Sequence, residues 1–272
     1  MHSMSISDPA NCVSLAVGFD DSRYALCLAA ALARSTPHHR LILVLNALPG
    51  PSVETLREEL GELPIQVALC CHSGNSGWPG GVQAAYETLI GKRIGTPPMS
   101  IALWHDDMLP AKNWTKALLH LESPDAGLVG LTTVALGDYE LTPGVEAVDL
   151  FNEVVEKQPA EGPIEQDVCS PYLIRQDALL PDEPLLDPSL GPGGWADWDL
   201  FERLLARGRS VVRDSSTLCY HWRVGRWFPD GQPDAVASSR RSYLDRWEKA
   251  GVWWKRVTSS RKVIYDETGR SD

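Results

Sequence analysis

The sequence predicts an α/β fold in which helices cover both faces of a mostly parallel central sheet. Two features of the first hundred residues predict it. Short apolar runs alternate with helical patterns, and each run is apolar throughout, as is typical of strands that are buried on both faces. Such a sheet belongs to the doubly wound class, in which ligands bind at the carboxyl ends of the strands.

The expected elements of this half follow one another in chain order. Strands are expected at 13–19, 41–45, 65–71 and 100–104, and helices at 24–33, 53–60 and 82–90. Asp20, Asp21 and Ser22 offer caps for the first helix. A turn-rich break is expected at 77–81. The polar residues after each strand should therefore face one common cleft.

The alternation is less regular in the second half. An acidic, loop-rich insertion is expected at 137–162, and the Pro, Gly and Asp residues of 180–194 predict a mobile loop, a natural lid. The remaining expected elements are strands at 128–134, 168–174, 211–212 and 217–222, a helix at 197–206 and an amphipathic helix at 238–250.

Size, hydropathy and charge exclude several classes. A chain of 272 residues can bury one large α/β core. The mean hydropathy is -0.18, and no apolar run approaches the ~18 to 20 residues that span a bilayer. No charged segment followed by an apolar stretch opens the chain, so we expect no signal peptide and a cytoplasmic protein. The net charge of -11 argues against a broad nucleic-acid surface.

The C-terminal tail is an exception to the acidic balance. From Arg240 onward there are nine Lys or Arg against five Asp or Glu. This tail is either a solvated face, a peripheral contact with an anionic lipid-linked acceptor at a membrane surface, or a contact with nucleic acid. The six cysteines form no C-x-x-C pair and are expected to be reduced.

A pair of acids follows the fourth expected strand, in the run Trp104-His105-Asp106-Asp107. Carboxylates are hard oxygen ligands that suit Mg²⁺ or Mn²⁺, and such a cation can bridge to a diphosphate. The alternative is a polar turn that caps the next element, which is expected to begin at Pro110. On this motif alone both interpretations stay open.

Two later motifs also allow two interpretations each. In the run from Gly193 to Leu200, glycines permit close approach of a ligand to the backbone, and Asp197 and Asp199 lie at the start of an expected helix. A simple helix cap by either aspartate is the alternative. His221, at the end of a late strand, is either a metal ligand or a structural histidine.

Taken in order, these segments resemble the GT-A-fold nucleotide-sugar glycosyltransferases of family 2. The resemblance extends from about Val13 to His221, and it depends on the order of the segments. They are the opening VSLAVGFDDS, Asn75-Ser76-Gly77 before the third helix, His105-Asp106-Asp107 in place of the Asp-x-Asp metal motif, Pro171 to Arg175 as the acceptor-side strand, Gly194 to Leu200, and the terminal Tyr220-His221.

The resemblance implies a GT-A (Rossmann-like) domain with a sugar-donor half at 1–134, a smaller acceptor and catalytic half at 135–235, and a C-terminal helical extension at 236–272. It implies transfer of a sugar from a nucleotide-diphosphate sugar to an acceptor hydroxyl with inversion, and Mn²⁺ or Mg²⁺ as cofactor. A UDP-sugar is favoured over a GDP- or dTDP-sugar. The acceptor stays open among a glycan, a lipid-linked glycan, a protein and a modified nucleobase.

The resemblance also implies roles for individual residues. Asp197 is expected as the general base, and Asp107 and His221 as the metal ligands. The residues expected to contact the nucleotide-sugar are Phe19, Asp21, Asn46, Asn75, Gly77, His105 and Asp106. Trp195, Trp198 and Asp199 are expected on the acceptor side, where indole faces suit sugar rings.

The sequence departs from the family pattern at several positions. Asn46 and His105 each stand where the family has an acid, and Ala196 replaces a common Glu. These changes keep open a catalytically silent module that binds nucleotide or sugar without turnover. A nucleotidyltransferase is the other alternative, but it would need a Gly-rich basic loop after the first strand, where residues 19–23 are acidic.

Overall fold

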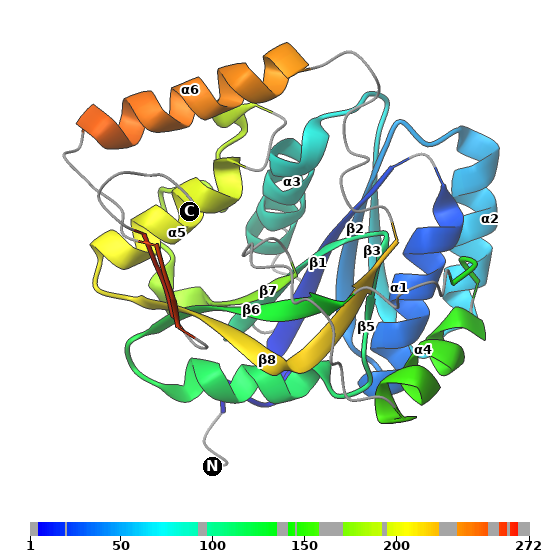
Figure 1. Ribbon diagram of the computed structural model, residues 1–272. Coiled ribbons are helices and arrows are strands. Elements are labelled where there is room, and N and C mark those ends of the chain that lie inside the picture. Colours follow the sequence, from blue (N-terminus) through cyan, green and yellow to red (C-terminus); the bar gives the residue numbers. More distant parts are fainter. Residues whose placement is uncertain are drawn as a thin grey trace.

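The structure is a computed structural model that describes residues 5–19, 21–91, 97–134, 141–144, 146–157, 171–191, 195–222, 233–249, 256–259 and 262–265. One central sheet runs through the molecule, with helices on both faces (Figure 1). This arrangement confirms the expected α/β class with a mostly parallel sheet.

Eight of the described strands form the sheet, in the order β3-β2-β1-β4-β7-β6-β8-β5. Their bounds are β1 Cys12–Phe19, β2 Arg40–Asn46, β3 Gln66–His72, β4 Ser100–His105, β5 Met108–Pro110, β6 Ala126–Val134, β7 Tyr172–Arg175 and β8 Ser210–His221. The first four strands in the sheet order are parallel, and β6 is parallel to β8. β7 is antiparallel to β4 and β6, and β5 is antiparallel to β8.

The parallel register brings the ends of the first strands to one edge. Phe19 lies opposite Asn46, and Asn46 lies opposite His72. His105 ends the neighbouring strand β4, opposite Val17. The polar residues that follow the apolar runs are therefore gathered at the carboxyl edge, as the sequence predicted.

The helices of the two layers pack on opposite faces. Their bounds are α1 Ser22–Ser35, α2 Gly50–Gly61, α3 Gly77–Gly91, α4 Glu146–Lys157, α5 Trp195–Ala206 and α6 Pro233–Lys249, with a 3-10 helix at Trp114–Glu122. α3, α5 and α6 share one apolar core with the sheet, and α1, α2 and the 3-10 helix share another. None of the described helices is long and apolar enough to cross a bilayer.

Several elements differ from the sequence-based expectation. The break expected at 77–81 is the first turn of α3, where a proline at position 79 removes no helical hydrogen bond. β8 is one strand from Ser210 to His221, with a register irregularity where two short strands were expected. The C-terminal extension expected to be helical also contains an antiparallel hairpin of β9 Arg256–Ser259 and β10 Lys262–Tyr265.

Side-chain contacts hold the segment 180–191 against neighbouring helices, whereas its composition predicted a mobile loop. Glu183 pairs with Arg203 and with Arg207, both on α5. Arg203 also donates to the carbonyl of Leu185 over 3.0 Å. Asp187 lies 2.7 Å from Arg246 of α6. These bonds anchor the segment to two helices.

The acidic segment expected as an insertion contains α4. Phe151 is fully buried on this helix and packs with Val148 against residues of α1 and β5. The surrounding acids, such as Glu146 and Asp149, lie on the exposed side and hide the apolar face from a composition-based analysis.

We expect Phe151→Ala to lower the free energy of unfolding by about 3–5 kcal/mol, because it leaves a cavity beneath α4. The neighbouring Leu150 is 39% exposed, so Leu150→Ala should change it by less than about 0.5 kcal/mol. Urea denaturation of both variants measures the difference. Equal effects would contradict the packing of α4 seen here.

Candidate active site

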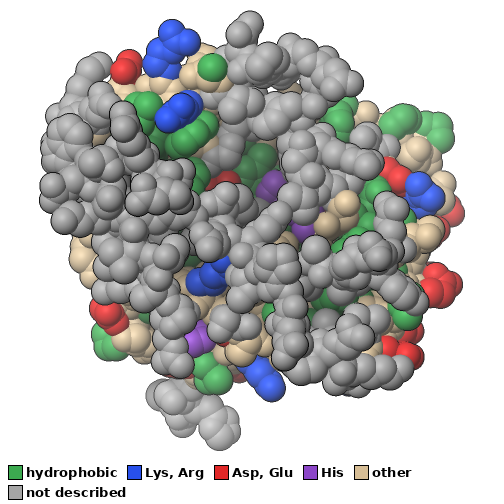
Figure 2. Space-filling model, viewed as in Figure 1, with side chains coloured by type: hydrophobic (Ala, Val, Ile, Leu, Met, Phe, Trp, Pro, Cys, Tyr) green, Lys and Arg blue, Asp and Glu red, His purple; other side chains and the backbone are tan. Residues whose placement is uncertain are grey.

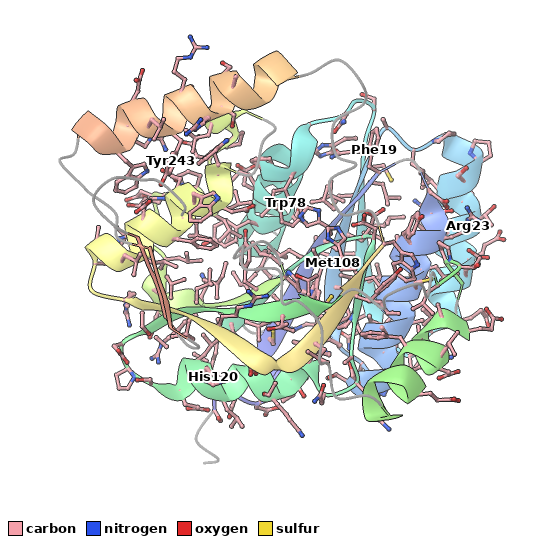
Figure 3. All side chains as sticks on the ribbon, viewed as in Figure 1. Phe19, Arg23, Trp78, Met108, His120 and Tyr243 are labelled. Atoms are coloured by element: carbon pink, nitrogen blue, oxygen red, sulfur yellow. The ribbon has the colours of Figure 1, made fainter. Side chains whose placement is uncertain are left out.

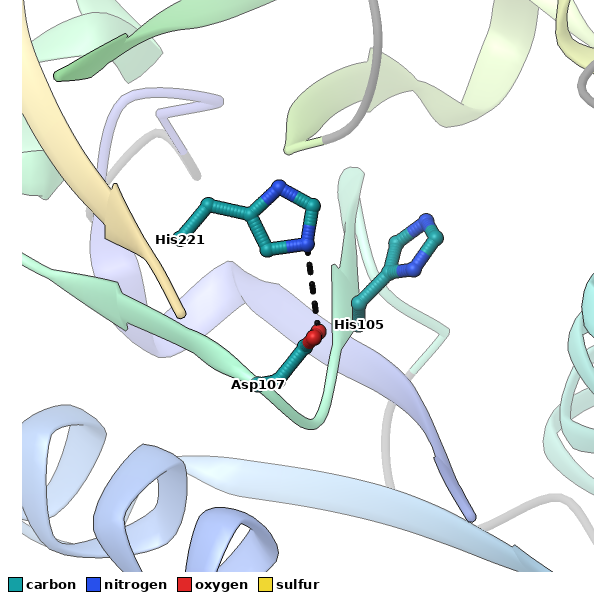
Figure 4. A group of neighbouring side chains, drawn as sticks. All are labelled: His105, Asp107 and His221. Carbon is teal, nitrogen blue, oxygen red and sulfur yellow. Dashed lines mark ion pairs between the residues drawn. The ribbon is translucent and has the colours of Figure 1, made fainter. Parts of the chain in front are cut away.

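A cluster of two histidines and one aspartate lies at the carboxyl edge of the sheet. β4 ends at His105, a tight turn carries Asp107, and β5 then pairs with the end of β8, so that Met108 lies opposite His221. Register and turn together bring three side chains from two distant segments to one place (Figure 4). Histidine and acidic side chains also show near the centre of this face in the space-filling view (Figure 2).

The geometry of this cluster fits a divalent cation. The ligand atoms of His105, Asp107 and His221 all lie within 4.8 Å of one another. His221 Nε2 is 3.3 Å from Asp107 Oδ1, and Asp107 is only 1% exposed. Metal–ligand bonds of about 2.0–2.2 Å bring donor atoms to within about 4 Å of one another, so small side-chain movements suffice.

The cluster contains both residues predicted as metal ligands and adds His105. The sequence analysis placed His105 among the contacts to the nucleotide-sugar. Its side chain is 9% exposed, and its ring lies edge-on to that of His221, with centroids 5.8 Å apart. The structure therefore groups His105 with the candidate metal ligands.

Asp197 lies in the first turn of α5 and is nearly buried, with 6% of its surface exposed. Trp78 donates its indole N–H to Oδ1 over 2.9 Å, and the Tyr172 hydroxyl donates to the same oxygen. Burial raises the pKa of Asp197 to about 6, and the two hydrogen bonds oppose this rise. The carboxylate is thus ionised at neutral pH and close to the range that suits a general base.

Trp78 connects Asp197 to the metal cluster and was not singled out by sequence reasoning. Its ring stacks on His105, with centroids 3.9 Å apart and planes 24° apart. It comes from the first turn of α3 and lies near the middle of the molecule (Figure 3). Its position directly after Asn75-Ser76-Gly77 could have drawn attention to Trp78. Its stacking on His105 is a tertiary contact, which the sequence does not record.

Three residues predicted to contact the nucleotide-sugar lie together at the sheet edge, where Asn46 at the end of β2 contacts the turn that leads into α3. Asn46 is buried, accepts a hydrogen bond from Ser76 Oγ over 3.0 Å and donates to the Gly77 carbonyl over 3.4 Å. Asn75 Oδ1 accepts from the Gly77 amide over 2.9 Å. Gly77 has φ of 67°, which favours glycine there. Asn46 thus holds the start of α3, while Asn75 is exposed beside it.

Two predicted acids stabilise local structure. Asp106 is fully buried, and its Oδ2 accepts from the Phe19 amide over 3.1 Å, which joins the end of β1 to the end of β4. Asp21 caps α1 by accepting from the Arg23 amide over 3.0 Å, and it also pairs with the Arg23 guanidinium. Asp106 therefore supports the turn that carries Asp107.

The residues predicted on the acceptor side divide into two groups. Trp195 and Trp198 are partly exposed at the start of α5, with ring centroids 6.5 Å apart, and Arg240 lies 5.8 Å from the Trp195 ring. Asp199 is fully buried and binds Arg203, Arg246 and Trp247. Its contacts assign it to the α5–α6 interface, in place of the acceptor contact expected from the sequence.

The fold and this edge cluster define the class of structure: the chain has the GT-A glycosyltransferase fold. No family model matches the sequence, and no curated protein matches it. Among solved structures, it is similar to TarS from S. aureus, with 14% identity and a TM-score of 0.54 over 86% of this chain and 39% of TarS. A TarS fragment solved with UDP has a TM-score of 0.51, and 59% of that fragment is covered.

A second similarity covers nearly all of both chains. Glucosyl-3-phosphoglycerate synthase from Mycobacterium tuberculosis is 13% identical, with a TM-score of 0.51 over 97% of this chain and 94% of that one. The same synthase was solved with Mn²⁺, UDP and glucosyl-3-phosphoglycerate, and that structure has a TM-score of 0.50. At these identities the comparisons establish the fold.

The raised pKa of Asp197 makes a prediction about stability. Between its ordinary value of 3.8 and about 6, the native state keeps a proton that the unfolded state releases, so this group's contribution to stability falls as the pH rises. The Asp197→Asn variant has no titrating group at this position, so its stability does not fall in this way as the pH rises. Its stability relative to the wild type should rise by on the order of 3 kcal/mol between pH 4 and pH 7. Urea denaturation across this range measures it, and parallel pH curves for the two proteins would contradict the shift.

Proposed function

We propose that this protein is a glycosyltransferase that moves a sugar from a nucleotide-diphosphate sugar to an acceptor hydroxyl with inversion. The observation that supports this most is one arrangement at the carboxyl edge of a GT-A sheet. A buried carboxylate, Asp197, is joined through a single indole ring to a cluster of metal-type ligands. Such an arrangement places a base and a diphosphate site next to each other.

His105, Asp107 and His221 are the residues that would hold Mn²⁺ or Mg²⁺. When bound there, the cation neutralises charge on the diphosphate leaving group. Two of the three ligands are imidazoles, whereas Mg²⁺ strongly prefers oxygen ligands. We therefore favour Mn²⁺, the ion present in the solved synthase with UDP.

Asp197 acts on the acceptor in this proposal. Its carboxylate takes the proton of the acceptor hydroxyl, whose oxygen attacks the anomeric carbon from the face opposite the diphosphate. The new carbon–oxygen bond forms while the bond to the diphosphate oxygen breaks, and its electron pair leaves with the nucleoside diphosphate. General-base catalysis of this kind contributes typically 10²- to 10⁴-fold, through an oxocarbenium-like transition state.

For the substrates we propose only the chemical class. UDP bound to one TarS fragment and to the synthase favours a UDP-sugar. Trp195 and Trp198 offer partly exposed indole faces for an acceptor sugar ring. Residues 192–194, which include Gly193 and Gly194, lie outside the described residues, as does much of the basic tail beyond Lys249.

Binding gives the first test. We expect UDP with Mn²⁺ to raise the melting temperature more than UDP alone or UDP with Mg²⁺, and more than GDP, dTDP or CDP. A ligand at 100 times its Kd stabilises a protein by about 2.7 kcal/mol, which a thermal-shift assay detects. His221→Ala should abolish the metal dependence. His120→Ala, a histidine outside the cluster, should preserve it.

No stabilisation by any of the four nucleotides would contradict the proposed sugar-donor site. Inorganic diphosphate with Mn²⁺, measured beside the four nucleotides, separates a nucleotide preference from a general effect of polyphosphates.

Catalysis gives the second test. Asp197→Asn should lower kcat for UDP release from the preferred UDP-sugar by about 10²- to 10⁴-fold, because the base is lost. Its affinity for UDP with Mn²⁺ should stay close to that of the wild type. Asp149→Asn, at an exposed position on α4, is the matched control and should retain full activity. Proton NMR of the product tests inversion at the anomeric carbon.

The outcome also separates the alternatives. A wild-type protein that binds UDP and Mn²⁺ but releases no UDP from any UDP-sugar would be a silent binding module. Equal turnover by wild type and Asp197→Asn would remove Asp197 from the mechanism while leaving the fold assignment intact.

A further inference from the structure

We propose that Trp78 is a positioning residue that sets the geometry of both halves of the site at once. Its ring face fixes the plane of His105, and its N–H fixes the carboxylate of Asp197. The inference rests on the proposed function for its role in catalysis, but the two contacts belong to the protein itself.

The first contact orients a candidate metal ligand. A histidine binds a cation along the plane of its ring, so a ligand histidine needs that plane to be fixed by its surroundings. The Trp78 ring lies nearly parallel to the His105 ring, at 3.9 Å between centroids. At 9% exposure His105 has little solvent on its other sides. Stacking therefore limits rotation of the imidazole about its side-chain bonds.

The second contact orients the candidate base. Within the described part of the chain, the side-chain donors to Asp197 are Trp78 and Tyr172, and both reach Oδ1. Holding one oxygen in this way directs the other, Oδ2, to the remaining direction in the carboxylate plane. A hydroxyl that gives its proton to Asp197 then has one preferred approach, which is what an in-line displacement requires.

The helix that carries Trp78 is itself fixed against the sheet. It begins at Gly77, which the Asn75 side chain caps over 2.9 Å. One turn further, a Cβ added at Gly81 would lie 2.6 Å from Val17 of β1, so α3 packs directly onto the strand. The indole is therefore held against the sheet by its own helix, and Trp78 is almost fully buried.

A single ring thus spans the distance between the metal cluster and the base. His105, Asp107 and His221 would hold a cation that binds the leaving diphosphate, and Asp197 would receive the proton of the incoming hydroxyl. Because these two groups must lie on opposite sides of the anomeric carbon, their separation and orientation decide whether attack is productive. Trp78 contacts both groups, whereas Tyr172 contacts Asp197 and the Phe201 ring.

This difference gives a pair of matched variants. Trp78→Phe keeps a ring against His105 and loses the N–H to Asp197, and Tyr172→Phe loses the other donor to the same oxygen. Trp78→Leu loses the ring. Two readouts are independent of turnover: the Kd for Mn²⁺ alone by titration calorimetry, and the pKa of Asp197 by carbon NMR of labelled aspartate carboxyls, assigned with Asp197→Asn.

We expect Trp78→Phe and Tyr172→Phe each to raise the pKa of Asp197 by about one unit, because each removes a donor to the ionised form. Both should keep the Mn²⁺ affinity within about twofold. Trp78→Leu should weaken Mn²⁺ binding by about 10- to 100-fold, the usual effect of losing a group that orients a ligand histidine. In turnover, Trp78→Phe should lower kcat with little change in KM for the UDP-sugar.

An unchanged pKa in Trp78→Phe would overturn the contact with Asp197, and unchanged Mn²⁺ affinity in Trp78→Leu would overturn the contact with His105. If Trp78→Leu fails to fold, weaker Mn²⁺ binding by Trp78→Ala or Trp78→Met replaces it, and Trp78→Phe still tests the base. A wild type without transfer activity would refute the proposed function, whereas both readouts would still decide the role of Trp78.

Discussion

The site depends on the pairing of β5 with the end of β8. β5 has three residues, all buried, and its register sets Met108 opposite His221. The Trp222 amide adds a bond to the Asp107 carbonyl over 3.0 Å. These backbone contacts bring His221 beside Asp107, although the two are more than a hundred residues apart in the chain. His105 and Asp107 come from one segment of the chain and His221 from another. The three side chains therefore meet only when β5 pairs with β8.

Asp106, Asp197 and Asp199 are all buried, but they differ in what surrounds them. Asp106 accepts a backbone amide, and Asp199 is compensated by two arginines and an indole. Asp197 instead receives hydrogen bonds from two neutral groups, Trp78 and Tyr172. With no cation among these donors, desolvation prevails and the pKa rises to about 6. The surroundings, rather than the residue type, separate a candidate base from two structural acids.

Much of the fold could be predicted because the information is local. Continuous apolar runs define buried strands, and polar residues after them must lie at the carboxyl edge. Asp107, Asp197 and His221 could be singled out by their positions at element ends, and the family resemblance implied their roles. The grouping of His105 with the candidate metal ligands, the contacts of Trp78 and the burial of Asp199 between α5 and α6 could not. Each depends on contacts between elements distant in the chain, which no spacing in the sequence records. α4 was hidden for another reason, since four acids are interspersed among the apolar residues of this helix.

The side chains at positions 105 and 78 are chemically compatible, a histidine with a tryptophan. A carboxylate at position 105 would find no favourable partner in the face of an indole, which is electron-rich, whereas an imidazole ring stacks on it. Replacing a carboxylate with an imidazole also leaves one formal negative charge among the three ligands. A bound divalent cation would then keep more of its positive charge for the diphosphate. A histidine at position 105 therefore changes both the formal charge of the candidate metal cluster and the way this side chain is held, and the stacking requires an aromatic ring at position 78.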